Sequence, residues 1–261
     1  MGMKENRFKQ MRAAGKVPVG QMLWECGSRG MARMMDACDV DFAIIDTEHA
    51  AFSSADVADL VAWFSATTIA PFVRVPEIAY HLLARTMDAG ALGVMAPNVT
   101  TADEARAIVD AVKFAPLGKR GIGLGGALTG YRGVTPAEFL TYSNENTTVI
   151  CQIESIAGIE NLEAITTTPG VDVLWVGHFD LTQSMGIPGQ FHDQRFLDNL
   201  KRVVDICNRH NLGAGIQPGT LEQAREWLAI GFNVISYGTD MSVYLAAMTD
   251  AVTQVRALAA K

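Results

Sequence analysis

The sequence of 261 residues lacks long hydrophobic runs, an excess of basic residues and any closely spaced cysteine pair. No apolar run approaches the roughly 18 residues that a membrane-spanning helix needs. The first 20 residues have no hydrophobic segment between their charges and Pro18, so they do not resemble a secretory signal. We therefore expect a cytoplasmic protein that does not enter a membrane.

The charge balance is acidic, with a formal net charge of −7 and an isoelectric point near 5.2. Such a chain has no basic field for nucleic acid or for anionic lipid, so we expect small molecules as its partners. The four cysteines lie far apart, mostly inside apolar runs, and are predicted to be reduced core residues. They are Cys26, Cys38, Cys151 and Cys207.

Short apolar runs alternate with helical patterns along almost the whole chain, which is typical of βα units. Most of the runs are apolar throughout, as expected of parallel strands that are buried on both faces. The eight predicted strands are 19–24, 42–46, 71–75, 92–97, 148–154, 171–177, 213–218 and 232–238. Eight such units predict a (β/α)₈ TIM barrel. A doubly wound sheet is the alternative, although it usually has fewer strands.

No linker rich in Pro, Ser or charge divides the chain, so one domain is predicted over residues 1–261. The only long irregular region is 115–133, and a loop of that length is usually functional. It contains "GIGLGG", which matches the dinucleotide fingerprint formally. The match is weak, because the motif neither follows a strand directly nor opens a helix.

Reactive side chains stand at the ends of four predicted strands, where the active site of a barrel is built. They are Asp46, Glu48 and His49 after the second strand, Arg74 on the third, Glu154 on the fifth, and His178 and Asp180 after the sixth. Each has a structural alternative, such as a helix cap or an ion pair. Their occurrence at four strand ends of eight favours a functional site.

The residue types suggest a role for each group. Glu154 and Asp180 suit a hard divalent cation such as Mg²⁺ or Mn²⁺, whereas the sequence has no HxH or HExxH pattern for zinc. His49 is the natural general base, and Asp46 is close enough in sequence to orient it. Arg74 offers a permanent positive charge to a developing oxyanion. Glu48 is expected to point away from the site or to support the loop.

Several segments together resemble the HpcH/HpaI aldolases, which are metal-dependent pyruvate aldolases. The resemblance covers nearly the whole chain and rests on "IIDTEHA", "PFVRV", "DAGALGVMAPNVTTADEARAIVDAVKFAPLGKRGIG", "CQIESIAGIENL" and "WVGHFDLTQSMGIPGQ". It implies a barrel in which Glu154 and Asp180 hold Mg²⁺, Mn²⁺ or Co²⁺. It also implies that His49 is the acid/base and that Arg74 binds the keto oxygen.

Further roles come from the same resemblance. Gln152 matches a position near bound pyruvate, and Asp88 matches one that assists the histidine from across a subunit contact. The sequence departs from the family in "GHFD", where many members have "GPxD". The departure concerns Gly177, His178 and Phe179, which we expect to form the pocket wall beside the substrate.

The predicted reaction is the reversible cleavage of a 4-hydroxy-2-oxo acid to an aldehyde and pyruvate, or a related 2-oxo acid such as hydroxypyruvate. The seven lysines lie outside the predicted strands, which disfavours a Schiff base as electron sink. The alternatives are a CoA-ester lyase of the malyl-CoA or citrate lyase β type and a 2-oxo acid binding barrel without turnover. Catabolism of aromatic compounds or sugar acids is the expected setting.

Two further expectations concern selectivity and assembly. Selectivity for the aldehyde is expected from loop 115–133, from residues 24–28 and from the surroundings of His178 and Phe179. The last predicted helix, 241–260, is apolar on more than one face. Together with the resemblance, this implies a homo-oligomer, commonly a hexamer, in which that helix packs against a neighbour.

Overall fold

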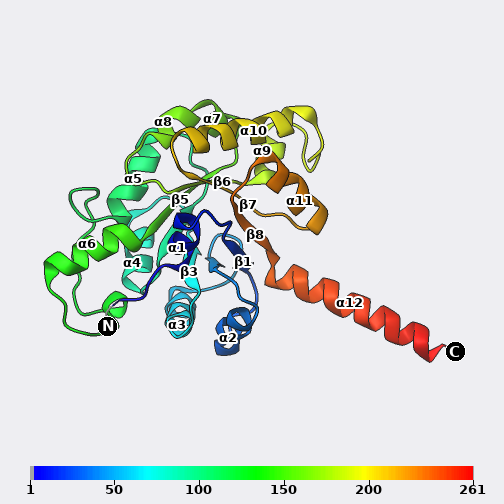
Figure 1. The fold of residues 1–261 in the computed structure, drawn as a ribbon, viewed down its shortest axis with the longest axis horizontal. Coiled ribbons are helices and arrows are strands. Elements are labelled where there is room, and N and C mark those ends of the chain that lie inside the picture. The colour runs from blue at the N-terminus through cyan, green and yellow to red at the C-terminus, as the bar shows by residue number, and fades with distance from the viewer. Residues whose placement is uncertain (1–2, 261) are drawn as a thin grey trace.

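The computed structural model describes residues 3–260 and forms a (β/α)₈ barrel (Figure 1). Eight parallel strands pair in chain order, and β8 closes the sheet against β1. The strands are β1 Val19–Leu23, β2 Phe42–Asp46, β3 Ala70–Arg74, β4 Gly93–Ala96, β5 Thr148–Ile153, β6 Val173–Val176, β7 Gly213–Ile216 and β8 Val234–Thr239. All eight predicted strands are confirmed, and the doubly wound alternative is wrong because the sheet closes on itself.

Helices surround the sheet, and several begin at capping boxes that the sequence encodes. Ser53, Thr101 and Thr135 each cap a helix by accepting a backbone N–H three residues later. The helices are α1 Arg7–Ala13, α2 Arg29–Ala37, α3 Ser54–Phe64, α4 Tyr80–Asp88, α5 Ala102–Val112, η1 Ala127–Thr129, α6 Pro136–Asn146, α7 Ile156–Glu160, α8 Leu162–Thr166, α9 His178–Ser184, α10 Gln194–Arg209, α11 Leu221–Ile230 and α12 Asp240–Ala259.

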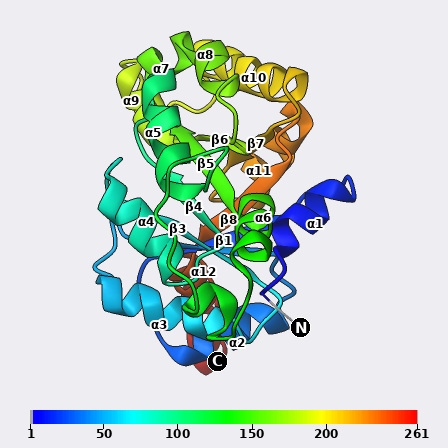
Figure 2. The ribbon, with the colours of Figure 1, turned by 90° about the vertical axis from the view of Figure 1, so that its left-hand side faces the viewer.

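The core has two large layers, one inside the barrel and one between the sheet and its helices, and a small third cluster of Phe114, Leu128 and Phe139. Helix α1, which the sequence did not predict, covers the end of the barrel where the strands begin (Figures 1 and 2). Its Phe8 lies edge-on against Phe42 and Phe72, with ring centroids 5.4 and 5.2 Å apart. This end is therefore filled with aromatic side chains, which leaves the opposite end for a site.

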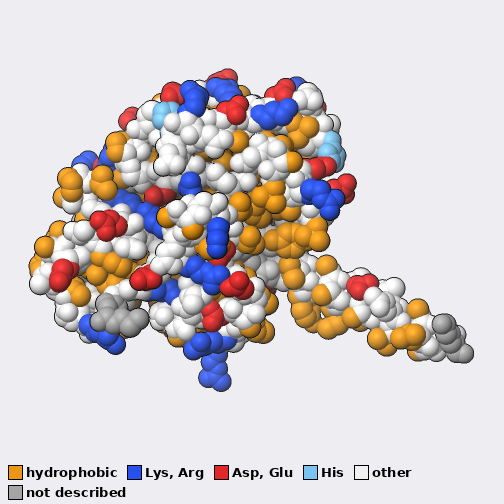
Figure 3. Space-filling model, in the orientation of Figure 1, with side chains coloured by type: hydrophobic (Ala, Val, Ile, Leu, Met, Phe, Trp, Pro, Cys, Tyr) orange, Lys and Arg blue, Asp and Glu red, His pale blue; other side chains and the backbone are white. Residues whose placement is uncertain are grey.

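Helix α12 projects away from the barrel (Figure 1). The structure describes all of its residues, and among them only Asp240 is buried. Hydrophobic side chains are exposed along its length (Figure 3). Despite this exposed apolar surface, no helix within residues 3–260 is long and apolar enough to cross a membrane.

Candidate active site

A cavity of about 480 Å³ opens at the carboxyl ends of the strands. Its wall contains seven of the predicted site residues, which come from strands or loops far apart in the sequence. These are His49, Arg74, Gln152, Gly177, His178, Phe179 and Asp180. Trp24, from the loop after β1, lines the cavity as well. The barrel thus brings the predicted groups to one mouth.

Arg74, the last residue of β3, is held by the neighbouring strand β2. Asp46 lies opposite it in the sheet register, and its carboxylate accepts hydrogen bonds from Arg74 Nε at 2.8 Å and Nη2 at 2.7 Å. Both side chains are buried. Burial lowers the pKa of Arg74, but the neighbouring carboxylates outweigh it and leave that pKa raised. The guanidinium is therefore permanently charged and fixed at the mouth.

Glu48 does not point away from the site, which was one of its two expected positions, because its side chain contacts Arg74 and His49. Its Oε2 lies 3.0 Å from Arg74 Nη1 and 4.0 Å from His49 Nε2. Burial raises the pKa of Glu48, although the charges of Arg74 and His49 act in the opposite direction. Asp46 contacts only the backbone of His49, whose N–H donates to Asp46 Oδ2 at 3.3 Å. Glu48, not Asp46, is thus the carboxylate nearest the imidazole ring.

Glu154 follows β5 behind the cavity-lining residues Gln152 and Gly177, and its carboxylate is buried and hydrogen-bonded on both oxygens. Its Oε1 accepts the backbone N–H of Asn98 at 2.7 Å, and Gln152 Nε2 donates to Oε2. A side chain at Gly177 would put its Cβ 2.7 Å from Glu154 Cβ, so only glycine leaves room there. Burial raises the pKa of Glu154, and the charges of Glu48 and Asp180 raise it further.

His178 and Phe179, at the start of α9, line the cavity and form an aromatic wall. The His178 ring lies 4.6 Å from the Phe179 ring and 5.2 Å from those of Phe191 and Trp227. Burial lowers the pKa of His178 to about 4. The ring is therefore neutral near pH 7. Asp180, two residues further, is exposed in the first turn of the helix.

The side chains around Glu154 fit a divalent cation. The negative charge of Asp180 raises the pKa of Glu154, which means that the two carboxylates repel each other. A bound cation would offset this repulsion. Gln152 Oε1 is buried without a hydrogen-bond partner and so offers a third oxygen at the same place. Residues 3–260 contain no group of three or more His, Cys, Asp or Glu side chains arranged as ligands. A hard cation here would complete its shell with water or substrate oxygens.

Asp88 is not part of the cavity of its own chain. It ends α4, which runs back from the mouth, and its carboxylate accepts from Arg120. Loop 115–133 lies beside the same helix, with the Gly121 N–H donating to Tyr80 Oη at 3.1 Å. No described residue of this loop lines the cavity, in contrast to the expected role in selectivity.

Sequence reasoning missed Asp240, which positions part of the mouth. Its carboxylate accepts the backbone N–H groups of Trp24, Glu25 and Cys26 at 2.9, 3.0 and 2.6 Å. These three bonds fix the loop after β1, and with it the indole that lines the cavity. The sequence signal was an acid directly after the apolar run of β8, although helix capping explains such an acid equally well.

The described residues that line the cavity include no lysine. Burial lowers the pKa of Lys113 to about 8, as a Schiff-base lysine would require. However, its Nζ donates to the carbonyl oxygens of Asn144 and Thr147 at 2.8 and 2.6 Å, beside the start of β5. Lys113 therefore lies at the opposite end of the barrel and has a structural role.

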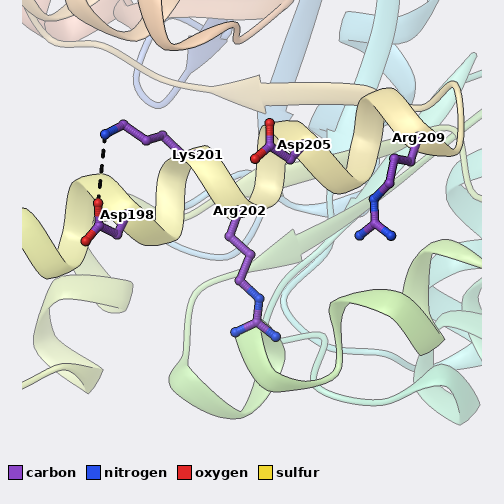
Figure 4. Close-up of a pocket in the computed structure, with 5 residues that line it drawn as sticks. All are labelled: Asp198, Lys201, Arg202, Asp205 and Arg209. Atoms are coloured by element: carbon purple, nitrogen blue, oxygen red, sulfur yellow. Dashed lines mark ion pairs between the residues drawn. The ribbon is translucent and has the colours of Figure 1, made fainter.

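A second hollow, of about 610 Å³, lies along the surface of α10 (Figure 4). All five residues that line it come from this one helix: Asp198, Lys201, Arg202, Asp205 and Arg209. Lys201 Nζ lies 3.8 Å from Asp198 Oδ1, one turn away. A single charged helix face without an opposing wall is a solvated surface, so we assign no site to it.

Comparison with known proteins gives a consistent result. The model of the HpcH/HpaI aldolase/citrate lyase family matches residues 21–247. The 5-keto-4-deoxy-D-glucarate aldolase of Shigella dysenteriae serotype 1 is 28% identical, with 93% of each chain covered. The 2-keto-3-deoxy-L-rhamnonate aldolase of Salmonella gallinarum is 29% identical, covering 93% of this chain and 90% of the relative.

Solved structures agree with the same assignment. An HpcH/HpaI aldolase from Desulfitobacterium hafniense superimposes with a TM-score of 0.90 at 26% identity, with 97% of each chain covered. An HpcH/HpaI aldolase/citrate lyase family protein from Burkholderia cenocepacia gives a TM-score of 0.88 at 31% identity, covering 96% of this chain and 99% of the other. The chain belongs to the HpcH/HpaI aldolase/citrate lyase family.

Proposed function

We propose that this member of the HpcH/HpaI aldolase/citrate lyase family is a divalent-metal-dependent aldolase. It cleaves a 4-hydroxy-2-oxo acid reversibly to an aldehyde and pyruvate, or a related 2-oxo acid. The observation that carries the proposal is the meeting of Asp180, Arg74 and His49 around one cavity whose described lining has no lysine. Glu154 lies directly behind this lining, in contact with Gln152 and next to Gly177. The aldolase activities of the relatives support the same reaction class and a role in sugar-acid catabolism.

Glu154 and Asp180 would hold the cation, which we propose to be Mg²⁺, Mn²⁺ or Co²⁺. When bound, such an ion acts as a Lewis acid on the carbonyl group of the 2-oxo acid. Gln152 Oε1, which has no partner inside the described part of the chain, would accept a hydrogen bond from a substrate hydroxyl or from water beside the cation. Gly177 leaves the space in which the Glu154 carboxylate lies. The two carboxylates thus define the position of the pyruvate half.

The remaining groups act on charge and protons. Arg74, fixed by Asp46, places its guanidinium where the negative charge develops on the keto oxygen. His49 takes the proton from the C4 hydroxyl as the C3–C4 bond breaks, and the bonding electrons pass to the three-carbon half. Half of the His49 side chain is exposed, so its ring can reach substrate or an intervening water.

Metal removal tests this proposal. Pyruvate release from a 4-hydroxy-2-oxo acid should stop after treatment with EDTA and return with Mg²⁺, Mn²⁺ or Co²⁺. In Glu154→Gln and Asp180→Asn, the Kd for Mn²⁺ should rise, as measured by electron paramagnetic resonance. The rise should exceed the roughly 10- to 100-fold effect of changing a residue that only hydrogen-bonds to a metal ligand. Glu160→Gln, on the exposed end of α7, is the matched control. Full activity after exhaustive chelation would refute the metal site.

We further propose that the chain assembles as a homo-oligomer, a hexamer by its family resemblance, through α12. The exposed apolar residues of this helix include Val243, Tyr244, Leu245, Met248, Val252, Val255 and Leu258. A solitary projecting helix with such a surface is stabilised by burial against another chain. Asp88 would then approach the His49 of a neighbouring subunit. Light scattering that gives 28.1 kDa at micromolar concentration would contradict the oligomer.

A further inference from the structure

The cavity has a charged side and an uncharged side. The charged side carries Arg74 and Asp180, and the buried Glu154 lies behind its Gln152 and Gly177. The opposite wall comes from the segment after β7, the first turn of α11 and the junction of β8 with α12. Its residues are Gln217, Gly219, Gln223, Gly238, Thr239, Met241 and Ser242, none of which is charged. If the charged side binds the pyruvate half, the aldehyde half faces this wall.

Two glutamines in this wall are fixed by their own hydrogen bonds. Gln217 Nε2 donates to the carbonyl oxygen of Gly238 at 2.9 Å, so its Oε1 is left as an acceptor. Gln223 Oε1 accepts the backbone N–H of Gly219 at 2.9 Å, so its Nε2 is left as a donor. The wall therefore presents the carbonyl acceptor of Gln217 and the amide N–H donors of Gln223. A hydroxyl group can satisfy both, whereas a carboxylate only accepts.

A second carboxylate on the substrate would find no positive partner here. Among the described residues that line the cavity, Arg74 is the one permanent cation, and Asp46 and Glu48 already pair with it. The His178 ring packs against the rings of Phe179, Phe191 and Trp227. The charged group under the uncharged wall is Asp240, which is negative. Burying an unpaired carboxylate at such a place is costly.

Resting on the proposed aldolase function, we propose that the aldehyde half of the substrate is an uncharged hydroxyaldehyde whose hydroxyl binds Gln217 and Gln223. A semialdehyde that bears a second carboxylate is disfavoured. In the synthetic direction, pyruvate and the aldehyde join by a new carbon–carbon bond, and the proton lost from the pyruvate methyl group balances the one gained by the aldehyde oxygen. No oxidant or reductant is required.

Two matched pairs of aldehydes test the inference with the assembled, metal-loaded enzyme and saturating pyruvate. Lactaldehyde against propanal isolates the hydroxyl, and loss of one or two hydrogen bonds predicts a kcat/KM about 10-fold higher for lactaldehyde. Succinic semialdehyde against butanal isolates the carboxylate, and the unpaired charge predicts a kcat/KM at least about 10-fold lower for the semialdehyde.

Variants locate the effect. In Gln217→Leu and Gln223→Leu, the ratio of lactaldehyde to propanal should fall towards one, and Gln217→Arg should raise the ratio of succinic semialdehyde to butanal. Gln194→Leu and Gln194→Arg, at an exposed position of α10, should leave both ratios unchanged. Because each ratio is internal to one variant, partial loss of folded protein does not affect it.

The outcomes separate the inference from the function beneath it. Preference for succinic semialdehyde over butanal, or equal use of lactaldehyde and propanal, would overturn the uncharged hydroxyaldehyde while leaving the aldolase in place. Wild-type ratios in all three glutamine variants would overturn the assignment of this wall. If none of the four aldehydes condenses with pyruvate and no 4-hydroxy-2-oxo acid is cleaved, the proposed function fails and the inference fails with it.

Discussion

Replacing Asp46 with asparagine should disturb Arg74 while leaving the ring of His49 in place. The carboxylate accepts two hydrogen bonds from the guanidinium, at 2.8 and 2.7 Å, and two backbone N–H groups, those of Glu48 at 3.0 Å and His49 at 3.3 Å. In Asp46→Asn, one oxygen becomes an NH₂ group that faces the N–H groups of Arg74. The pair therefore loses its charge and at least one of its hydrogen bonds.

The magnitude follows from the burial of this pair. Asp46 is 0% exposed and Arg74 is 6% exposed, so water cannot replace the lost contact. Removing one partner of a buried ion pair costs about 3–5 kcal/mol. Glu48, 3.0 Å from Nη1, compensates in part, so we expect a value near the lower limit. For a chain of this size, about 3 kcal/mol corresponds to a decrease in Tm of roughly 6–12 °C.

Two double-mutant cycles in kcat/KM identify the partner through which Asp46 acts. Combined with Arg74→Lys, Asp46→Asn should be strongly non-additive, with a coupling energy of about 1–3 kcal/mol. Combined with His49→Ala, it should be additive to within about 0.5 kcal/mol. Asp205→Asn, exposed on α10, is the control for loss of one negative charge. Additivity with Arg74→Lys together with coupling to His49→Ala would refute the reasoning and restore Asp46 as the residue that orients the base.

Three other changes probe separate parts of the molecule. His49→Ala should lower kcat by about 10²- to 10⁴-fold with little change in pyruvate inhibition, and turnover within a few-fold of wild type would place the acid/base role elsewhere. Gly177→Ala should displace Glu154 and weaken Mn²⁺ binding, whereas Gly126→Ala, where a Cβ meets nothing within 4 Å, should not; equal affinities would contradict the steric argument. Burial lowers the pKa of Lys113 from 10.5 to about 8. Between these two pH values the unfolded chain binds one proton more than the folded chain. The free energy of unfolding therefore rises with pH across this window, by about 3 kcal/mol. Urea unfolding at pH 7.5 and 10, at fixed protein concentration, should show a smaller rise for Lys113→Met, and an unchanged pH dependence would refute this.

The strands could be predicted closely because each is an apolar run that the barrel buries on both faces. The predicted strand at 71–75 is observed at Ala70–Arg74, and that at 42–46 is observed unchanged. Helix α1 could not be predicted, because Phe8 is its only buried residue and one apolar residue makes no periodic pattern. Its position depends on Phe42 and Phe72, which are distant in the sequence.

The charged side of the site was also predictable, whereas side-chain directions within it were not. An ionisable residue at the end of an apolar run stands out, which is how Asp46, Arg74 and Glu154 were found. Glu48 lies in a loop, where backbone periodicity does not determine which way a side chain faces. Its contact with Arg74 arises only because β3 lies beside β2 in the closed sheet.

The residues of the uncharged wall could not be predicted from the sequence, because they do not differ chemically from their neighbours in the chain. Gln217 and Gln223 resemble any surface glutamine in the sequence, and neither interrupts a pattern of charge. The orientation of their side chains depends on Gly238 and Gly219, whose backbone groups bind one end of each amide and leave the other end free. Because such orientation depends on contacts between separate loops, groups that choose among uncharged substrates leave little trace in a single sequence. Charged residues at the end of a nonpolar strand are easily recognised in a sequence. The reaction class is therefore more readily predicted from sequence than the identity of the substrate.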